Sequence, residues 1–382
     1  MANTRAKIGI LTLPLWGNYG GLLQAFALYR SCERLGLNPG IAEWTTPERG
    51  GRWIRLMRTF RRKLLKALRM LTSGAGADVL FHYRLTLQSR AFVSRFIPMR
   101  YEDGSASSNP PDAYIVGSDQ VWRLSYRKDH EPGFYFLSRA SEAQRRSSIA
   151  YAASFGSDRW EGDETEAEEC ARLLRDFKAV SVREHSGVRL CRENLGCTSA
   201  VQMPDPTLLA QMSDYEDVMN SEPSPCPNKP YLASYILDHS EQVEPLIESV
   251  SQELGLGWSS LLPHRSAQDQ KVEPLSVASW LSLMRGSRAL ITDSFHGCVF
   301  ALIFHIPFVC LGNSHRGMSR FDSLLSTFGL RDRLLLEHSR DKIGQLLDKP
   351  IDWQRIDAIR EGEKQRGLAF IASAFPSSSE IH

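Results

Sequence analysis

The stretch Arg288-Ala-Leu-Ile-Thr-Asp-Ser-Phe-His-Gly-Cys-Val-Phe-Ala-Leu-Ile-Phe304 joins a strand pattern directly to a helix pattern. Ala289–Thr292 is a short apolar run typical of a buried parallel strand, and residues 299–304 begin an apolar helix. A second apolar run, residues 307–311, follows after a helix-length interval. The stretch therefore predicts a strand–helix–strand unit whose ligand crevice lies outside the carboxyl end of the first strand.

His296 falls in the first turn of this expected helix, just after Asp293 and Ser294, which are typical helix N-cap residues. Backbone N–H groups and the positive end of the helix dipole favour anions at such a position. Two interpretations are open at this point. Either His296 caps the helix, or it is an ionisable group placed against a bound anion.

The composition is that of an ordinary soluble globular protein, with 42% apolar and 24% charged residues and a formal net charge of +2. The 382 residues suffice for two domains, and the charge balance gives no reason to expect a nucleic-acid partner. The seven cysteines form no Cys-x-x-Cys pair, so we expect a reducing compartment and no structural zinc. Because we find neither a signal-peptide pattern nor an apolar stretch of about 18 residues, we expect a cytoplasmic protein or one bound peripherally to a membrane.

Strand and helix patterns alternate along the chain, which predicts an α/β fold. Four prolines exclude regular structure at residues 221–230, so we place a linker there. It divides a first domain, residues 1–220, from a second, residues 231–382, which ends in a helix over 352–373. In the first domain we expect strands at 7–13, 113–116, 148–153 and 179–182 and a helix at 22–35. In the second we expect strands at 231–236 and 258–262 and helices at 242–254 and 277–284.

Three arginines are candidates to complete an anion site with His296. Arg183 follows an apolar strand pattern, while Arg316 and Arg320 lie in the segment after the strand expected next to the His296 helix. Guanidinium groups bind phosphate and carboxylate through two parallel hydrogen bonds. Their shared placement after predicted strands indicates an anion site.

Two short turns are further candidates, because each follows an apolar strand pattern. Trp16-Gly-Asn-Tyr-Gly-Gly21 has glycines that let backbone N–H groups approach a ligand, but it lacks the spacing of a phosphate-binding loop. Ile115-Val-Gly-Ser-Asp-Gln-Val-Trp122 places Gly117 and Ser118 at a strand end. The first is a binding loop or a plain tight turn, and the second is a binding loop or a helix cap.

Residues 52–71 contain eight basic residues and no acidic one, and their apolar residues recur at three- and four-residue steps. This is the pattern of a basic amphipathic helix suited to an anionic membrane surface. A helix packed on its own domain with a solvated cationic face is the alternative. A nucleic-acid patch is not favoured, because only Trp53 and Phe60 interleave with the cations.

Six short motifs occur in order between residues 18 and 297. They are Asn18-Tyr-Gly-Gly-Leu-Leu-Gln-Ala-Phe-Ala-Leu28, Ile115-Val-Gly-Ser-Asp-Gln-Val-Trp122, Ala150-Tyr-Ala-Ala-Ser-Phe-Gly156, Ser181-Val-Arg-Glu184, Asp205-Pro-Thr-Leu-Leu209 and Thr292-Asp-Ser-Phe-His-Gly297. Together they resemble the motifs of the polysaccharide pyruvyltransferase family. The resemblance implies two Rossmann-like domains arranged as in GT-B glycosyltransferases, with the active site in the cleft between them. It also implies transfer of a pyruvyl group from phosphoenolpyruvate to two hydroxyls of a sugar, giving a cyclic ketal, with no further cofactor and no metal.

The resemblance also implies roles for residues near phosphoenolpyruvate. His296 matches the family's histidine at that site and would be the general acid that protonates the donor's methylene carbon. Arg183 and Arg316 match basic residues that would hold the donor's phosphate and carboxylate. Many members have an arginine where this chain has Ser294, so Arg316 or Arg320 would have to replace it. The sugar acceptor would lie against the first domain, with contacts from Asn18, Ser118, Asp119 and Gln120.

Two other functions fit the same pattern. A nucleotide-sugar glycosyltransferase of the GT-B type would use the same cleft and helix N-termini for a diphosphate. A non-catalytic binding protein of a polysaccharide assembly complex would need only the fold. For the pyruvyltransferase, an acceptor linked to polyprenyl diphosphate would account for peripheral contact with the inner membrane face.

Overall fold

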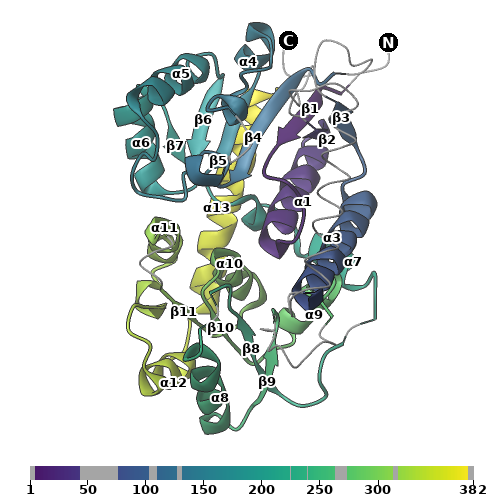
Figure 1. Ribbon diagram of the computed structural model, residues 1–382, viewed down its shortest axis with the longest axis vertical. Coiled ribbons are helices and arrows are strands. Elements are labelled where there is room, and N and C mark those ends of the chain that lie inside the picture. Colours follow the sequence, from purple (N-terminus) through teal and green to yellow (C-terminus); the bar gives the residue numbers. More distant parts are fainter. Residues whose placement is uncertain are drawn as a thin grey trace.

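The computed structural model describes residues 5–43, 76–102, 110–126, 131–223, 225–238, 240–262, 273–312 and 317–376. The chain forms two α/β units, each built on a parallel sheet, one above the other in Figure 1. The predicted α/β fold is confirmed. The basic segment 52–71 and Arg316 lie outside the described residues.

The first unit contains a seven-stranded sheet in the order β3-β2-β1-β4-β5-β6-β7. Its strands are β1 (Lys7–Leu11), β2 (Asn38–Glu43), β3 (Arg100–Glu102), β4 (Ala113–Asp119), β5 (Ile149–Ala153), β6 (Ala179–Val182) and β7 (Val201–Gln202). Its helices are α1 (Tyr19–Arg34), α3 (Gly76–Phe96), α4 (Glu142–Arg146), α5 (Glu164–Leu174), α6 (His185–Leu195) and α7 (Met212–Met219). The strand order reverses between β1 and β4, so their carboxyl ends flank a topological switch point where α/β proteins bind ligands.

The second unit contains a five-stranded sheet in the order β12-β11-β10-β8-β9. Its strands are β8 (Tyr231–Tyr235), β9 (Gly257–Ser260), β10 (Ala289–Thr292), β11 (Phe308–Leu311) and β12 (Leu334–Leu335). Its helices are α8 (Val243–Glu253), α9 (Val277–Arg285), α10 (Phe295–Phe304), α11 (Ser319–Thr327), α12 (Arg340–Asp348) and α13 (Trp353–Ala374). The predicted strand–helix–strand unit at 288–311 is confirmed, because α10 joins the neighbouring parallel strands β10 and β11.

Local hydrogen bonds explain where the structure departs from the expected elements. Helix α1 begins at Tyr19 rather than at residue 22, since the Asn18 side chain accepts a hydrogen bond from Gly21 N at 3.3 Å and caps the helix there. Strand β4 continues to Asp119, and the next helical turn is a 3₁₀ turn at Leu124–Tyr126. The interpretation of Ser118 as a helix cap is therefore wrong.

Helix α13 returns from the second unit to the first (Figure 1). Lys178 Nζ donates to the Ala374 carbonyl at 2.5 Å, and Arg366 Nη2 donates to the Gln202 carbonyl at 2.9 Å. At the other side of the junction, the Tyr19 ring stacks on Trp280 with 5.4 Å between centroids. A single buried apolar cluster contains residues of both units. The two units are thus joined by a packed core as well as by the linker.

Candidate functional site

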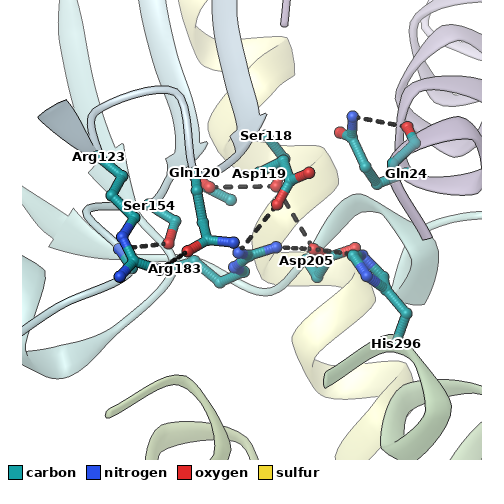
Figure 2. A network of polar contacts seen from close by, with 12 residues as sticks. Gln24, Ser118, Asp119, Gln120, Arg123, Ser154, Arg183, Asp205 and His296 are labelled. Carbon is teal, nitrogen blue, oxygen red and sulfur yellow. Dashed lines mark hydrogen bonds and ion pairs between the residues drawn. The ribbon is translucent and has the colours of Figure 1, made fainter. Parts of the chain in front are cut away.

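The site lies where β4 and β6 of the first unit end opposite the start of α10 in the second (Figure 2). His296 is in the first turn of α10, directly after β10. Ser294 is the N-cap of α10, because its side chain accepts a hydrogen bond from Gly297 N at 3.4 Å. The interpretation of His296 as the helix cap is therefore wrong, and its ring is free for another task.

The His296 ring is enclosed by residues of the first unit. Only 6% of the residue is exposed, and its Nε2 lies 3.6 Å from Asp205 Oδ2 without forming a hydrogen bond. On the other side, a Cβ atom at Gly20 would overlap Nδ1 and Cγ of the imidazole. The histidine of one domain is thus placed between a carboxylate and a glycine of the other.

Arg183 follows β6, as predicted, and connects two carboxylates. Its Nη1 donates to Asp205 Oδ2 at 2.8 Å, and its Nη2 donates to Asp119 Oδ1 at 3.5 Å. The guanidinium also lies over the Phe295 ring, with Cζ 4.5 Å from the ring centroid, which is a cation–π geometry. We call Asp119, Arg183, Asp205 and His296, in this spatial order, the ionisable row.

Asp205 is the residue of this row to which the sequence pattern gave no role. Its Oδ1 accepts hydrogen bonds from Thr207 N at 3.0 Å and from Thr207 Oγ1 at 2.7 Å. Burial alone would raise the pKa of the Asp205 carboxyl, but His296, Arg183 and the Thr207 backbone N–H together hold that pKa well below its ordinary value. Asp205 therefore carries a negative charge beside His296 at neutral pH. Its signal in the sequence was the Asp-Pro-Thr motif, which also reads as the cap of a short helix.

A third buried carboxylate and a second arginine flank Arg183. Glu184 accepts a hydrogen bond from Ser154 Oγ, and burial raises the pKa of Glu184 despite the neighbouring Arg183. Arg320, from α11 of the second unit, has its pKa lowered to about 10 by burial and by the charge of Arg183. Arg183 and Arg320 share the lining of a cavity of about 20 Å³ with Asp205 and Phe295. Two guanidiniums thus face one small cavity.

The remaining predicted residues lie around this centre. Ser118 Oγ donates to the Ala152 carbonyl at 3.1 Å and to Asp205 Oδ2 at 3.4 Å, so it faces inward. Gln120 Oε1 accepts from Arg123 Nη1 at 3.1 Å, to one side of the ionisable row in Figure 2. Asn18 lies at the start of α1. The structure therefore brings His296, Arg183, Ser118 and Asp119 together around Asp205, with Gln120 beside them.

A cleft of about 750 Å³ opens on the second unit, beyond the carboxyl ends of its strands. Its lining includes Asp238, Gln242, Asp293, Leu311 and His338. Asp293 accepts hydrogen bonds from Leu237 N at 2.7 Å and Asp238 N at 2.8 Å, which ties the loop after β8 to the start of α10. The turn that carries His296 thus also forms part of this cleft's wall.

No helix in the described ranges is long and apolar enough to cross a membrane. In the same ranges, no group of three or more histidine, cysteine, aspartate or glutamate side chains is arranged to hold a metal ion.

Comparison with known proteins identifies the family. The model of the polysaccharide pyruvyl transferase family matches residues 18–315. The chain belongs to this family. The resemblance drawn from the six motifs is confirmed, and membership indicates a transferase. No curated protein matches the chain.

Solved structures share the fold at low sequence identity. A Listeria monocytogenes structure with a provisional assignment as UDP-N-acetylglucosamine 2-epimerase has 10% identity and a TM-score of 0.53, covering 99% of this chain and 98% of its own. Staphylococcus aureus MnaA in complex with UDP has 12% identity and a TM-score of 0.51, covering 97% of this chain and 96% of its own. The predicted fold class, two Rossmann-like domains in a GT-B-like arrangement, is confirmed.

Proposed function

We propose that this protein transfers the pyruvyl group of phosphoenolpyruvate to two hydroxyls of a sugar in a polysaccharide or its precursor, forming a cyclic ketal. Family membership supports the reaction class. The observation that carries the proposal for this chain is the ionisable row, which ends in a buried histidine where the two domains meet.

Ketal formation begins with protonation of the donor's methylene carbon, which creates positive charge at the adjacent carbon. That step needs a general acid, and imidazole is the side chain that ordinarily titrates near neutral pH. We assign this task to His296. The Asp205 carboxylate, 3.6 Å away, would hold the orientation of the His296 ring, as a carboxylate does for histidine in hydrolase triads.

The donor's phosphate and carboxylate need positive charge at the same place. Arg320 and Arg183 line one small cavity, and the first-turn N–H groups of α10 add the positive end of a helix dipole. Arg320 would therefore replace the arginine that many members have where this chain has Ser294. Since Arg183 already binds Asp205 and Asp119, we assign it the added task of holding the ionisable row. Direct donor contacts from Arg183, Ser294 and Arg316 stay predictions.

The acceptor would lie against the first domain, near Asn18, Ser118, Asp119 and Gln120. We further propose that the acceptor is linked to polyprenyl diphosphate and that the basic segment 52–71 holds the enzyme at the inner membrane face. In support, α3, which follows that segment in the chain, exposes 39% of Leu80, 54% of Tyr83 and 45% of Leu87. These residues recur at helical spacing, so they lie on one side of α3.

The test is turnover by the purified protein with phosphoenolpyruvate and methyl glycosides that offer different hydroxyl pairs. Phosphate release together with a pyruvyl ketal in the product's mass spectrum would support the proposal. His296→Gln should lower the rate by about a hundredfold or more. His305→Asn is the matched control, because His305 lies at the other end of α10 and pairs with Asp357. Turnover of nucleotide sugars instead would indicate a glycosyltransferase, and donor binding without turnover would indicate a binding protein.

A further inference from the structure

We infer that Asp119 is the general base that takes the proton from the attacking sugar hydroxyl, at the opposite end of the ionisable row from His296. The inference rests on the proposed pyruvyl transfer and adds a catalytic residue to it. Three observations carry it: a free carboxylate oxygen, the glycine turn that this oxygen faces, and the bonds that fix its direction.

Among the three buried carboxylates of the site, only Asp119 has an oxygen suited to accept a proton from substrate. Both oxygens of Asp205 are used, one by Thr207 and the other by Arg183 and Ser118. Glu184 accepts the Ser154 hydroxyl through Oε1, and although its Oε2 has no partner, Glu184 has no exposed surface through which a substrate could reach it. Asp119 binds Arg183 through Oδ1 alone, at 3.5 Å, while its Oδ2 has no hydrogen-bond partner among the described residues.

The free oxygen faces the first turn of α1, where glycines occupy two consecutive positions. A Cβ atom at Gly21 would lie 3.6 Å from Asp119 Oδ2 and 3.5 Å from the Asn18 amide nitrogen. The preceding Gly20 faces the His296 ring. One glycine turn therefore adjoins both the proposed acid and the proposed base. The Asn18 amide, whose oxygen caps α1, can donate through Nδ2 to a hydroxyl bound beside Asp119.

The backbone directs Asp119 toward this turn. Its φ is 70°, in the left-handed region that aspartate adopts only at some cost, about 1 kcal/mol or more. The Asp119 carbonyl accepts hydrogen bonds from Ser154 N at 2.9 Å and Val121 N at 2.8 Å. Thr12 Oγ1 donates to the Ser118 carbonyl at 3.1 Å and accepts from Gln24 Nε2 at 3.0 Å. Gln24 is thus a positioning residue for the turn that carries Asp119.

The attacking hydroxyl loses its proton as its oxygen bonds to carbon, and a base beside it accepts that proton. His296 gives a proton to the methylene carbon, and the first hydroxyl oxygen forms a bond to the adjacent carbon as its proton passes to Asp119 Oδ2. The second hydroxyl oxygen then bonds to the same carbon while the carbon–oxygen bond to phosphate breaks, and its proton leaves with the phosphate. Water returns a proton to His296 and removes one from Asp119. The net products are the ketal and hydrogen phosphate.

Two variants test the assignment on the full-length protein, with phosphoenolpyruvate and a methyl glycoside that the wild type turns over. In Asp119→Asn the new side chain has the same shape, and asparagine tolerates the left-handed backbone. This variant should lower kcat by about a hundredfold or more. Its donor binding, measured by calorimetry, should not be weakened. Asp119→Gly leaves space for a small carboxylate, so added formate should restore activity where equal chloride does not.

Positioning by Gln24 has its own control. Gln24→Leu should lower kcat while leaving donor affinity and the pH profile of the remaining activity unchanged. Gln88→Leu is the matched control, since Gln88 also has a buried amide oxygen without a partner but lies on α3, bonded to the Pro274 carbonyl.

The inference is overturned if Asp119→Asn turns over within about threefold of the wild type, or if formate fails to rescue a folded Asp119→Gly protein. A wild type that transfers no pyruvyl group would instead refute the proposed function, and this inference with it.

Discussion

The His296 imidazole of the second domain lies directly against Gly20 in the first turn of α1 in the first domain. A side chain at position 20 would occupy the space of the ring's Nδ1 and Cγ atoms. Glycine at this position therefore lets the two domains approach closely enough for His296 to lie 3.6 Å from Asp205. The contact links the packing of the domain junction to the placement of the proposed acid.

Gly20→Ala is expected to destabilise the protein and to reduce turnover together. The added methyl group forces the His296 ring or the domain junction to move, and overpacking of this kind costs about 1–3 kcal/mol. Urea denaturation measures the first effect and phosphate release from phosphoenolpyruvate the second. Gly362→Ala, within α13 with open space around the added Cβ, is the control and should keep or raise stability. Unchanged stability and rate in Gly20→Ala would mean that the His296 ring does not pack tightly against residue 20.

Asp205→Asn is expected to reduce the dependence of stability on acid pH. Because the folded state holds the pKa of Asp205 below its unfolded value, the ionised carboxyl stabilises the protein above about pH 4, and this contribution is lost as the pH falls below that value. Burial raises the pKa of Glu184, so this residue changes stability with pH in the opposite direction. Its contribution is the same in the wild type and in Asp205→Asn.

The measurement is the free energy of unfolding in urea between pH 7 and pH 3. Asp205→Asn should be less stable than the wild type at pH 7 and should lose less stability on acidification. Parallel curves for Asp205→Asn and the wild type would contradict the assigned charge of Asp205.

Substitutions of Arg183 and Arg320 are expected to have different effects. Replacing Arg183 should lower stability, and replacing Arg320 should weaken donor binding. Arg183→Lys keeps the charge but cannot bridge Asp205 and Asp119 as the two guanidinium nitrogens do, so both stability and rate should fall. Arg183→Gln should cost more, about 3–5 kcal/mol, because it leaves buried carboxylates without a cation. Arg320→Gln should chiefly weaken phosphoenolpyruvate binding in calorimetry. If Arg320→Gln binds the donor normally while Arg183→Lys does not, their roles are the reverse of those proposed.

The sequence predicted well what depends on short stretches of chain. His296 and Arg183 were placed correctly because apolar strand patterns precede each of them, and polar residues at strand ends meet at one edge of a parallel sheet. The contacts that organise the site were not predictable from local patterns. Gly20 meets His296 only through the packing of the two domains, and Arg183 meets Asp205 only through the tertiary fold of the first domain. The helix over 352–373 was expected, but its return to Lys178 depends on tertiary packing that its own pattern does not encode. Aspartate adopts a left-handed backbone more often than most residues, but that Asp119 does so depends on the contacts of the β4 turn, which the residue type does not reveal.

The basic segment 52–71 is expected to bind anionic membranes. Each basic residue near such a surface contributes about 1 kcal/mol, and this attraction weakens with salt. Changing Arg55, Arg58, Arg62 and Lys66 to Gln should abolish co-sedimentation with phosphatidylserine vesicles at low salt while sparing activity on a soluble methyl glycoside.

A second variant, Leu80→Ser with Leu87→Ser, removes exposed apolar surface from α3 and should weaken sedimentation without affecting its salt dependence. Vesicles of neutral phosphatidylcholine are the control. A wild type that stays in solution with anionic vesicles even at low salt would show that the segment packs on its own domain, with its cations facing solvent.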